Sequence, residues 1–157
     1  MTRTYGRAPT NERVYGSVPK NWGDNITLSA GLTRDGLIAP LRLIGAMNSD
    51  VFEAYVEQFV VPELRPGDVV VMDNLSAHKR ASIGALIAGA GAELVYLPPY
   101  SPDLNPIEMV WSKVKAVLRT IGARTFDELE EAIVIALAAI SSTDATNCIA
   151  HAGYSLP

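Results

Sequence analysis

The chain has 157 residues, of which 48% are hydrophobic and 19% charged, and these proportions are typical of one globular domain with its own core. Its longest apolar runs, such as residues 132–140, are far shorter than the roughly 20 residues of a membrane span, and the N-terminus does not resemble a signal peptide. The single cysteine excludes an internal disulfide framework and favours a reducing compartment such as the cytoplasm, while the net charge of −4 neither indicates nor excludes a nucleic-acid partner.

A β-hairpin is predicted in the first part of the chain. Residues 25–32 and 37–44 alternate as strands do, and Asp35-Gly36 between them is a hairpin signal. Pro40 lacks the N–H that a central strand donates, so the second strand is expected at a sheet edge or at a bulge.

Two short apolar runs predict strands that are buried on both faces. They cover residues 69–72 and 93–97. A helical pattern precedes each of them, over residues 51–64, with Ser49 as a candidate N-cap, and over residues 80–90.

Two further helices are predicted before the C-terminus. Residues 105–120 form the clearest helix, because Asn105-Pro106 combines a good N-cap with a favoured first helical residue. Thr125 and Glu128 have the spacing of a capping box, which opens a last helix to about residue 140. The order of the elements predicts an α/β architecture, with a mixed sheet flanked by helices.

Asp73 follows the apolar run 69–72 directly. Ligands bind at the carboxyl ends of strands in open α/β sheets, so a carboxylate at this position is a candidate metal ligand. Asp73-Asn74 also has the composition of a simple turn, which is an equally good reading of these two residues alone.

Glu108 lies in the first turn of the helix predicted over residues 105–120, and 34 residues separate it from Asp73. Alone, Glu108 reads as the acid of a capping box that closes on the Asn105 amide. Together with Asp73 it supplies two hard oxygen ligands, which suit Mg²⁺ or Mn²⁺ and the phosphoryl-transfer chemistry that these ions support.

Other polar residues near these acids are weaker candidates. A single histidine is more often structural than functional, and exposed lysines and arginines on a helix are often only a solvated face. Candidate DNA contacts are Asn74, His78, Lys79, Asn105, Lys115 and Arg119.

Two segments carry a resemblance to a known family. V-V-M-D-N-L-S-A-H-K, which contains Asp73, and L-P-P-Y-S-P-D-L-N-P-I-E-M-V-W-S-K-V-K, which contains Glu108, resemble the catalytic domain of bacterial insertion-sequence transposases related to the mariner superfamily. The resemblance extends over nearly the whole chain, from M-T-R-T-Y-G-R-A-P onward, and the 34-residue gap is the family's usual spacing. It implies a ribonuclease-H-like DDE catalytic domain, with Asp73 as the second catalytic acid and Glu108 as the third.

The resemblance also implies parts that this sequence does not contain. The family's first catalytic aspartate lies on a central strand beside the strand of Asp73, whereas Asp24 and Asp35 come too late to take its place. The family's DNA-binding helix-turn-helix region has no counterpart either. We therefore expect residues 1–157 to form a partial catalytic domain that lacks the first central strand and is inactive alone.

The resemblance implies metal-dependent cleavage of DNA at transposon ends and transfer of the cut strand to a target. Mg²⁺ or Mn²⁺ would be the cofactor, DNA the partner, a homodimer the assembly, and the bacterial cytoplasm the location. Two alternatives stay open. One is a non-catalytic remnant that binds or inhibits an intact transposase, and the other is a ribonuclease-H-like nuclease that acts on RNA–DNA hybrids or DNA junctions.

Overall fold

A computed structural model describes residues 7–13, 15 and 25–155 of the chain. Within these residues, four strands form two separate sheets: an antiparallel pair, β1 (Ile26–Thr33) with β2 (Gly36–Ile44), and a parallel pair, β3 (Val69–Met72) with β4 (Glu93–Tyr96). The α-helices are α1 (Ser49–Tyr55), α2 (Ala81–Gly89), α3 (Pro106–Ile121), α4 (Phe126–Ala138) and α5 (Ser142–His151).

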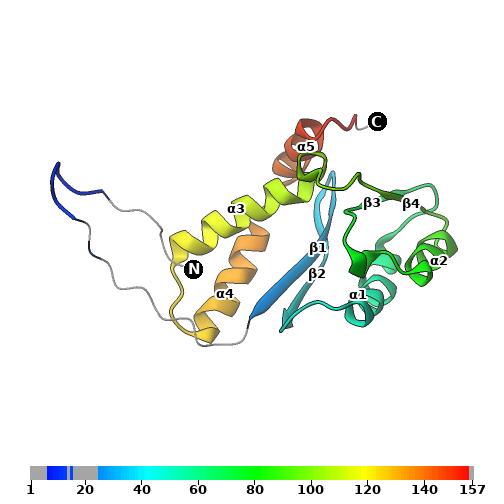
Figure 1. Cartoon of the computed structure of the whole chain (residues 1–157), viewed down its shortest axis with the longest axis horizontal. Helices are drawn as coiled ribbons and strands as arrows, with labels where there is room; N and C mark the ends of the chain where they lie inside the picture. Colours follow the sequence, from blue (N-terminus) through cyan, green and yellow to red (C-terminus); the bar gives the residue numbers. More distant parts are fainter. Residues whose placement is uncertain (1–6, 14, 16–24, 156–157) are drawn as a thin grey trace.

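The two sheets belong to two packed layers of helices and strands. The β1–β2 hairpin packs on α3 and α4, whereas β3 and β4 pack with α1 and α2 (Figure 1). Each layer has its own buried cluster, around Val56, Ile83 and Ile87 in one case and around Val110, Val114 and Ala136 in the other. The predicted α/β architecture is confirmed, and no strand of the described residues lies between the two sheets.

The hairpin contains the bulge that Pro40 predicts. Ser29 pairs with Leu41 but Gly31 pairs with Ile38, so the register shifts between them. Ala39 takes a φ of 48° at this point, and the Tyr55 hydroxyl donates a 2.9 Å hydrogen bond to its carbonyl. The bulge is therefore held from α1.

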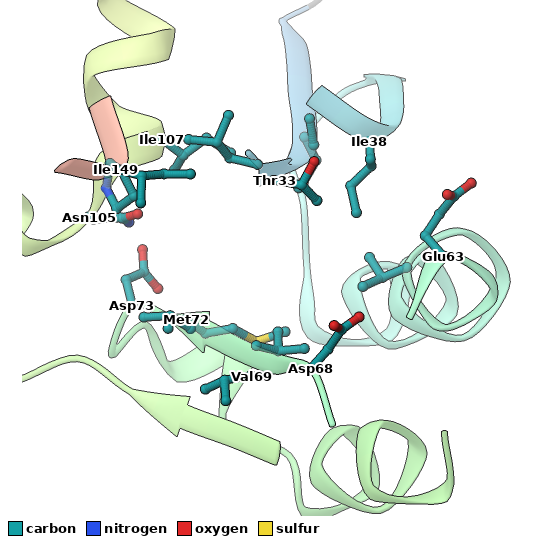
Figure 2. A pocket seen from close by; sticks show the side chains of 18 of the residues that line it. Thr33, Ile38, Glu63, Asp68, Val69, Met72, Asp73, Asn105, Ile107 and Ile149 are labelled. Atoms are coloured by element: carbon teal, nitrogen blue, oxygen red, sulfur yellow. The ribbon is translucent and has the colours of Figure 1, made fainter. Parts of the chain in front are cut away.

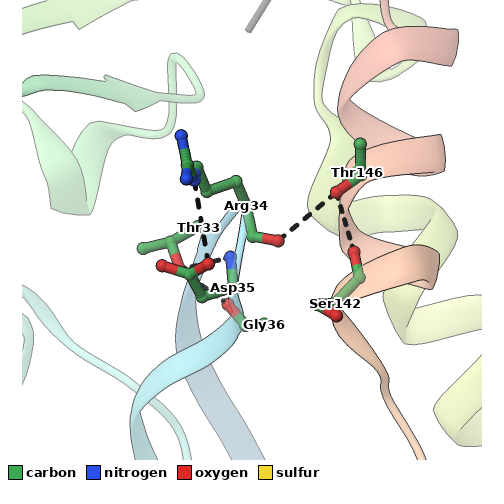
Figure 3. Close-up of polar contacts among 6 residues, drawn as sticks. All are labelled: Thr33, Arg34, Asp35, Gly36, Ser142 and Thr146. Carbon is green, nitrogen blue, oxygen red and sulfur yellow. Dashed lines mark hydrogen bonds and ion pairs between the residues drawn. The ribbon is translucent and has the colours of Figure 1, made fainter. Parts of the chain in front are cut away.

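The hairpin turn is joined to α5. The Thr33 hydroxyl donates to the Gly36 carbonyl across the turn, and the Thr146 hydroxyl of α5 lies 3.4 Å from the Arg34 carbonyl (Figure 3). The end of β1 consequently lies next to the C-terminal helix.

The helix predicted over residues 51–64 is not a single α-helix. Its N-cap is Asn48, whose side chain accepts from the Val51 amide, and not Ser49 as predicted. After α1 the chain continues as a π-helical turn over Val56–Val60 and a 3-10 turn over Val61–Glu63. Pro62 cannot donate to the fourth preceding carbonyl, so a regular α-helix cannot continue through it.

The last helix, α5, was not predicted. The last predicted helix ended at about residue 140, but the chain forms a further helix over Ser142–His151. Ser141 and Asp144 form a capping box at its start, and this spacing was the available signal. It was missed because the sequence S-T-D-A-T-N-C-I-A-H is mostly polar, and the helix buries only Ala145 and Ile149.

The prediction that the strands 69–72 and 93–97 are buried on both faces was wrong. Alternate residues of β3 are open to solvent, with 57% of Val69 and 37% of Val71 exposed. Val95, which pairs with Val71 on β4, is also exposed. The reason is that no element of the described chain covers this face of the small parallel sheet.

The remaining helices follow the predictions closely. Val110, Val114 and Leu118 of α3 are buried, whereas Ile121 at its end is exposed. The capping box of Thr125 and Glu128 is present at the start of α4. In the described residues no single helix is long and apolar enough to cross a membrane. Only α4 and α5 taken together, which meet at a bend of 71°, have the length and composition of a membrane span.

Candidate active site

A cavity of about 720 Å³ lies between β1 and β3 and reaches the start of α3 and Tyr154, near the end of the described residues. Its walls are mainly apolar, and Asp73 lies on its wall beside Asn105, toward which its carboxylate points (Figure 2). Glu63 and Asp68 lie at the opposite end of the cavity from Asp73. The polar and aromatic residues on its wall include Asp73, His78, Asn105, Glu108, Phe52 and Tyr154.

The Asp73 carboxylate has one occupied and one open oxygen. Its Oδ1 accepts a 3.2 Å hydrogen bond from the Leu75 amide, and the same atom lies 2.6 Å from Nδ1 of His78. No described residue hydrogen-bonds to Oδ2. Asp73 therefore shapes a turn, as its simpler reading expected, and still presents an oxygen to the cavity.

Glu108 is not the acid of a capping box, so the simpler reading of this residue was wrong. The Asn105 amide donates to the Pro102 carbonyl at 3.1 Å, and the Asn105 side chain makes no capping hydrogen bond. No described residue forms a hydrogen bond or ion pair with the Glu108 carboxylate. Pro106, which needs no N–H partner, starts the helix, so the carboxylate remains available at the cavity.

The structure brings together half of the polar residues singled out from the sequence. Asp73, His78, Asn105 and Glu108 all line the cavity. The other four do not line it. Asn74 is half-buried, and the basic side chains of Lys79, Lys115 and Arg119 are exposed.

The donor groups suit a hard divalent cation that keeps much of its own water. In the described part of the chain, no three His, Cys, Asp or Glu side chains gather closely enough to hold a metal ion together. Two carboxylates and the Asn105 amide oxygen nevertheless line one cavity, and Mg²⁺ commonly binds proteins through one or two carboxylates plus substrate phosphate oxygens. The residues present therefore fit such an ion as part of its ligand set.

Two aromatic residues of the site were not found from the sequence. Phe52 of α1 stacks on His78, with the ring centroids 4.0 Å apart. The Tyr154 hydroxyl donates a 2.8 Å hydrogen bond to the Leu104 carbonyl, just before α3. Both contacts join segments that are distant in the sequence, and neither residue has a local motif that marks it.

The fold is that of the catalytic domains of mariner transposases. The alignment with the Mos1 strand transfer complex covers 100% of this chain and 51% of the Mos1 chain, with a TM-score of 0.72 at 14% identity. The alignment with the isolated catalytic domain of the Mos1 mariner transposase covers 84% of this chain and 83% of that domain, with a TM-score of 0.56 at 12% identity. This likeness defines a ribonuclease-H-like α/β fold.

The chain belongs to the family described as DDE superfamily endonuclease, whose model matches residues 1–132. It is 30% identical over 111 residues to the Transposable element Tcb1 transposase of Caenorhabditis briggsae, an alignment that covers 65% of this chain and 41% of that protein. The chain is thus related to mariner and Tc1 transposases, and it spans about half the length of these relatives or less.

Proposed function

We propose that the chain is part of the catalytic domain of a bacterial insertion-sequence transposase that cuts DNA at transposon ends and joins it to a target. The observation that carries this proposal is the pair of open carboxylates, Asp73 and Glu108, on one cavity of a DDE-family fold. Relatives support the choice of substrate, since one solved Mos1 structure is a strand transfer complex and another is a paired end complex with Mn.

Asp73 and Glu108 would hold Mg²⁺ or Mn²⁺. Such an ion supplies Lewis-acid stabilisation of phosphate charge and activates a water or a 3′-hydroxyl. Asp73 would contribute its open Oδ2, while the Leu75 amide keeps Oδ1 engaged in the turn. Asn105, which faces Asp73, would hydrogen-bond a phosphate oxygen and orient the strand to be cut.

The basic side chains outside the cavity would bind DNA at a distance from the reacting phosphate. Lys115 and Arg119 are exposed on α3, the helix that carries Glu108, and Lys79 is exposed in the segment after Asp73. Contacts of this kind fix the position of a duplex without reading its sequence. Asn74 follows Asp73 directly in the sequence and His78 lies 2.6 Å from its carboxylate, so both would be closer to the proposed metal.

A third carboxylate would come from a strand outside the described residues. The cavity separates β1 from β3, and the free edges of both strands present unpaired backbone groups to an added strand. A strand inserted there would join the two small sheets into one mixed sheet. We propose that residues 1–157 are the C-terminal part of a longer transposase whose upstream part supplies this strand, its aspartate and a helix-turn-helix region.

DNA would be the main partner, as both transposon end and target, and a homodimer the working assembly. The paired end complex of Mos1 supports an arrangement in which two ends are held together. A DNA substrate and a single cysteine fit the bacterial cytoplasm as the place of action.

The experiment compares the 157-residue chain with a version extended by its upstream reading frame. Each is incubated with Mg²⁺ or Mn²⁺ and a supercoiled plasmid that carries the DNA flanking the gene. The extended protein should nick the plasmid, the shorter chain should not, and Asp73→Asn or Glu108→Gln in the extended protein should abolish nicking. Undiminished nicking by Asp73→Asn would contradict the proposal.

A non-catalytic role is the second candidate, favoured by the finding that no three metal-ligating side chains gather in the described residues. In that case the extended protein would also be inactive, and the chain would instead bind or inhibit an intact transposase. Cleavage of RNA–DNA hybrids or branched DNA without preference for the flanking sequence would indicate a ribonuclease-H-like nuclease.

A further inference from the structure

We infer that His78 is a positioning residue, which holds the Asp73 carboxylate in the orientation that leaves Oδ2 open to a cation. The inference rests on the proposed function, because it assigns Asp73 as a ligand. It gives His78 a part in the site that differs from a contact with DNA, since its ring faces Asp73 and its side chain is only 18% exposed.

The contact between the two side chains is close but not aligned. Nδ1 of His78 lies 2.6 Å from Oδ1 of Asp73, yet this buried nitrogen forms no hydrogen bond of ordinary geometry. A buried donor without an aligned acceptor is costly, so a small rotation of the carboxylate toward the ring is favoured. Hydrogen bonds of this kind are often poorly aligned in unliganded sites and tighten in the working complex.

Two contacts and a 3-10 turn restrict the imidazole and its backbone. Phe52 of α1, itself buried, stacks on the ring at 4.0 Å with an interplanar angle of 28°. The Tyr96 hydroxyl of β4 donates a 2.6 Å hydrogen bond to the His78 carbonyl. His78 ends a 3-10 turn over Ser76–His78, so it is anchored to α1 and β4 close to the turn that Asp73 begins.

Oδ1 of Asp73 is thereby held from two sides, by the Leu75 amide and by His78. With Oδ1 fixed, rotation of the carboxylate is restricted and Oδ2 keeps one direction. Groups that orient a ligating carboxylate typically change metal affinity or activity by about 10–100-fold when they are removed. A histidine that only filled space beside Phe52 would have no such effect.

The test measures Mn²⁺ binding to the full 157-residue chain. Binding is monitored by electron paramagnetic resonance, in which the signal of the free ion decreases as the ion binds. His78→Leu keeps the apolar contact with Phe52 and removes the donor, whereas His78→Asn keeps an N–H donor close to the position of Nδ1. We expect affinity to fall about 10–100-fold in His78→Leu and to be largely restored in His78→Asn. Tyr55→Phe, which loses its bond to Ala39 and leaves His78 untouched, controls for loss of stability.

The outcomes separate this inference from the proposed function. If Asp73→Asn loses Mn²⁺ binding but His78→Leu binds as the unaltered chain does, the positioning role is wrong and the metal site stands. Equal losses in His78→Leu and His78→Asn would also overturn the role, because the donor would then be irrelevant. If the unaltered chain binds no Mn²⁺, or Asp73→Asn binds equally well, the proposed site fails and the inference fails with it.

Discussion

The Tyr154 hydroxyl donates a 2.8 Å hydrogen bond to the Leu104 carbonyl, so the C-terminal end of the described chain is tied to the loop from which α3 begins. Glu108 lies in the first turn of that helix. The other hydrogen bonds of this loop, such as Leu104 N–H to Ser101 and Asn105 N–H to the Pro102 carbonyl, are local, so the bond from Tyr154 helps to keep the start of α3 at the cavity. The position of a proposed metal ligand thus depends on a residue 46 positions further along the chain.

Removal of this bond should loosen the first turn of α3. Tyr154→Phe deletes the donor, and we expect a loss of about 0.5–1.5 kcal/mol in the free energy of the local closed state. Amide hydrogen exchange measures it: the amides of Asn105, Ile107 and Glu108 should exchange faster than in the unaltered chain, while those of residues 130–136 in α4 stay unchanged. Unchanged exchange at the start of α3 would show that Tyr154 does not restrain this helix.

The sequence predicts this region only in part. Asn105-Pro106 places the start of α3 correctly, because N-cap and first-turn preferences depend on neighbouring residues. Tyr154 and Phe52 reach the site through contacts between distant segments, which no local pattern records. Asp73 and Glu108 are marked locally by the end of a strand and the start of a helix, and the family resemblance adds only their roles. The irregular second half of the 51–64 helix was not predicted, because the periodic pattern does not register the effect of Pro62.

Burial of the strands could not be predicted from their composition. A run such as Val69–Met72 reads as buried on both faces, but Val69 and Val71 are exposed where no described element covers them. An apolar strand is suited to burial on both faces, but each face is buried only where another element packs against it.

The core around α2 should carry much of the stability. Ile83 is fully buried, so Ile83→Ala should lower the free energy of unfolding by about 2–5 kcal/mol through lost contacts and a residual cavity. Val134 on α4 is 67% exposed, and Val134→Ala should change it by no more than about 0.5 kcal/mol. Urea unfolding measures both, and similar losses at the two positions would contradict this assignment of the core.

Tyr55 should matter for the bulge in β2. Tyr55→Phe leaves the Ala39 carbonyl without its 2.9 Å partner in a buried setting, which should cost about 1–3 kcal/mol. Burial also raises the pKa of the Tyr55 hydroxyl, in keeping with a neutral donor. A thermal melt compares the variant with Tyr15→Phe, an exposed control; equal melting temperatures for the two variants would show that the bond contributes nothing.

Stability should fall in acid partly because of Asp144. Lys113, whose Nζ lies 2.6 Å from the carboxylate, and the Ser141 hydroxyl hold the pKa of Asp144 well below its usual value of 3.8. The folded chain therefore binds the proton less tightly than the unfolded chain. The stability that the ionised Asp144 contributes is therefore fully present above the pKa that Asp144 has in the unfolded chain. It is lost as the pH falls toward the lower pKa of Asp144 in the folded chain.

Lys113→Ala should reduce that dependence on pH. Melting temperatures recorded from about pH 6 down to about pH 3 should fall less steeply in Lys113→Ala than in the unaltered chain. Lys115→Ala, an exposed lysine on the same helix, is the matched control and should keep the full slope. An unchanged slope in Lys113→Ala would mean that the ion pair does not stabilise the folded carboxylate.

The most direct test of the central claim is whether one divalent ion depends on both Asp73 and Glu108. Mn²⁺ binding is titrated for the unaltered chain, Asp73→Asn, Glu108→Gln and the double variant, with Glu63→Gln as a control acid on the far side of the same cavity. A shared ion predicts that each single substitution weakens binding at least about tenfold, that the double variant loses less than the two effects combined, and that Glu63→Gln binds normally. Unchanged binding by Glu108→Gln, or equal losses in Glu63→Gln, would contradict the two-carboxylate site.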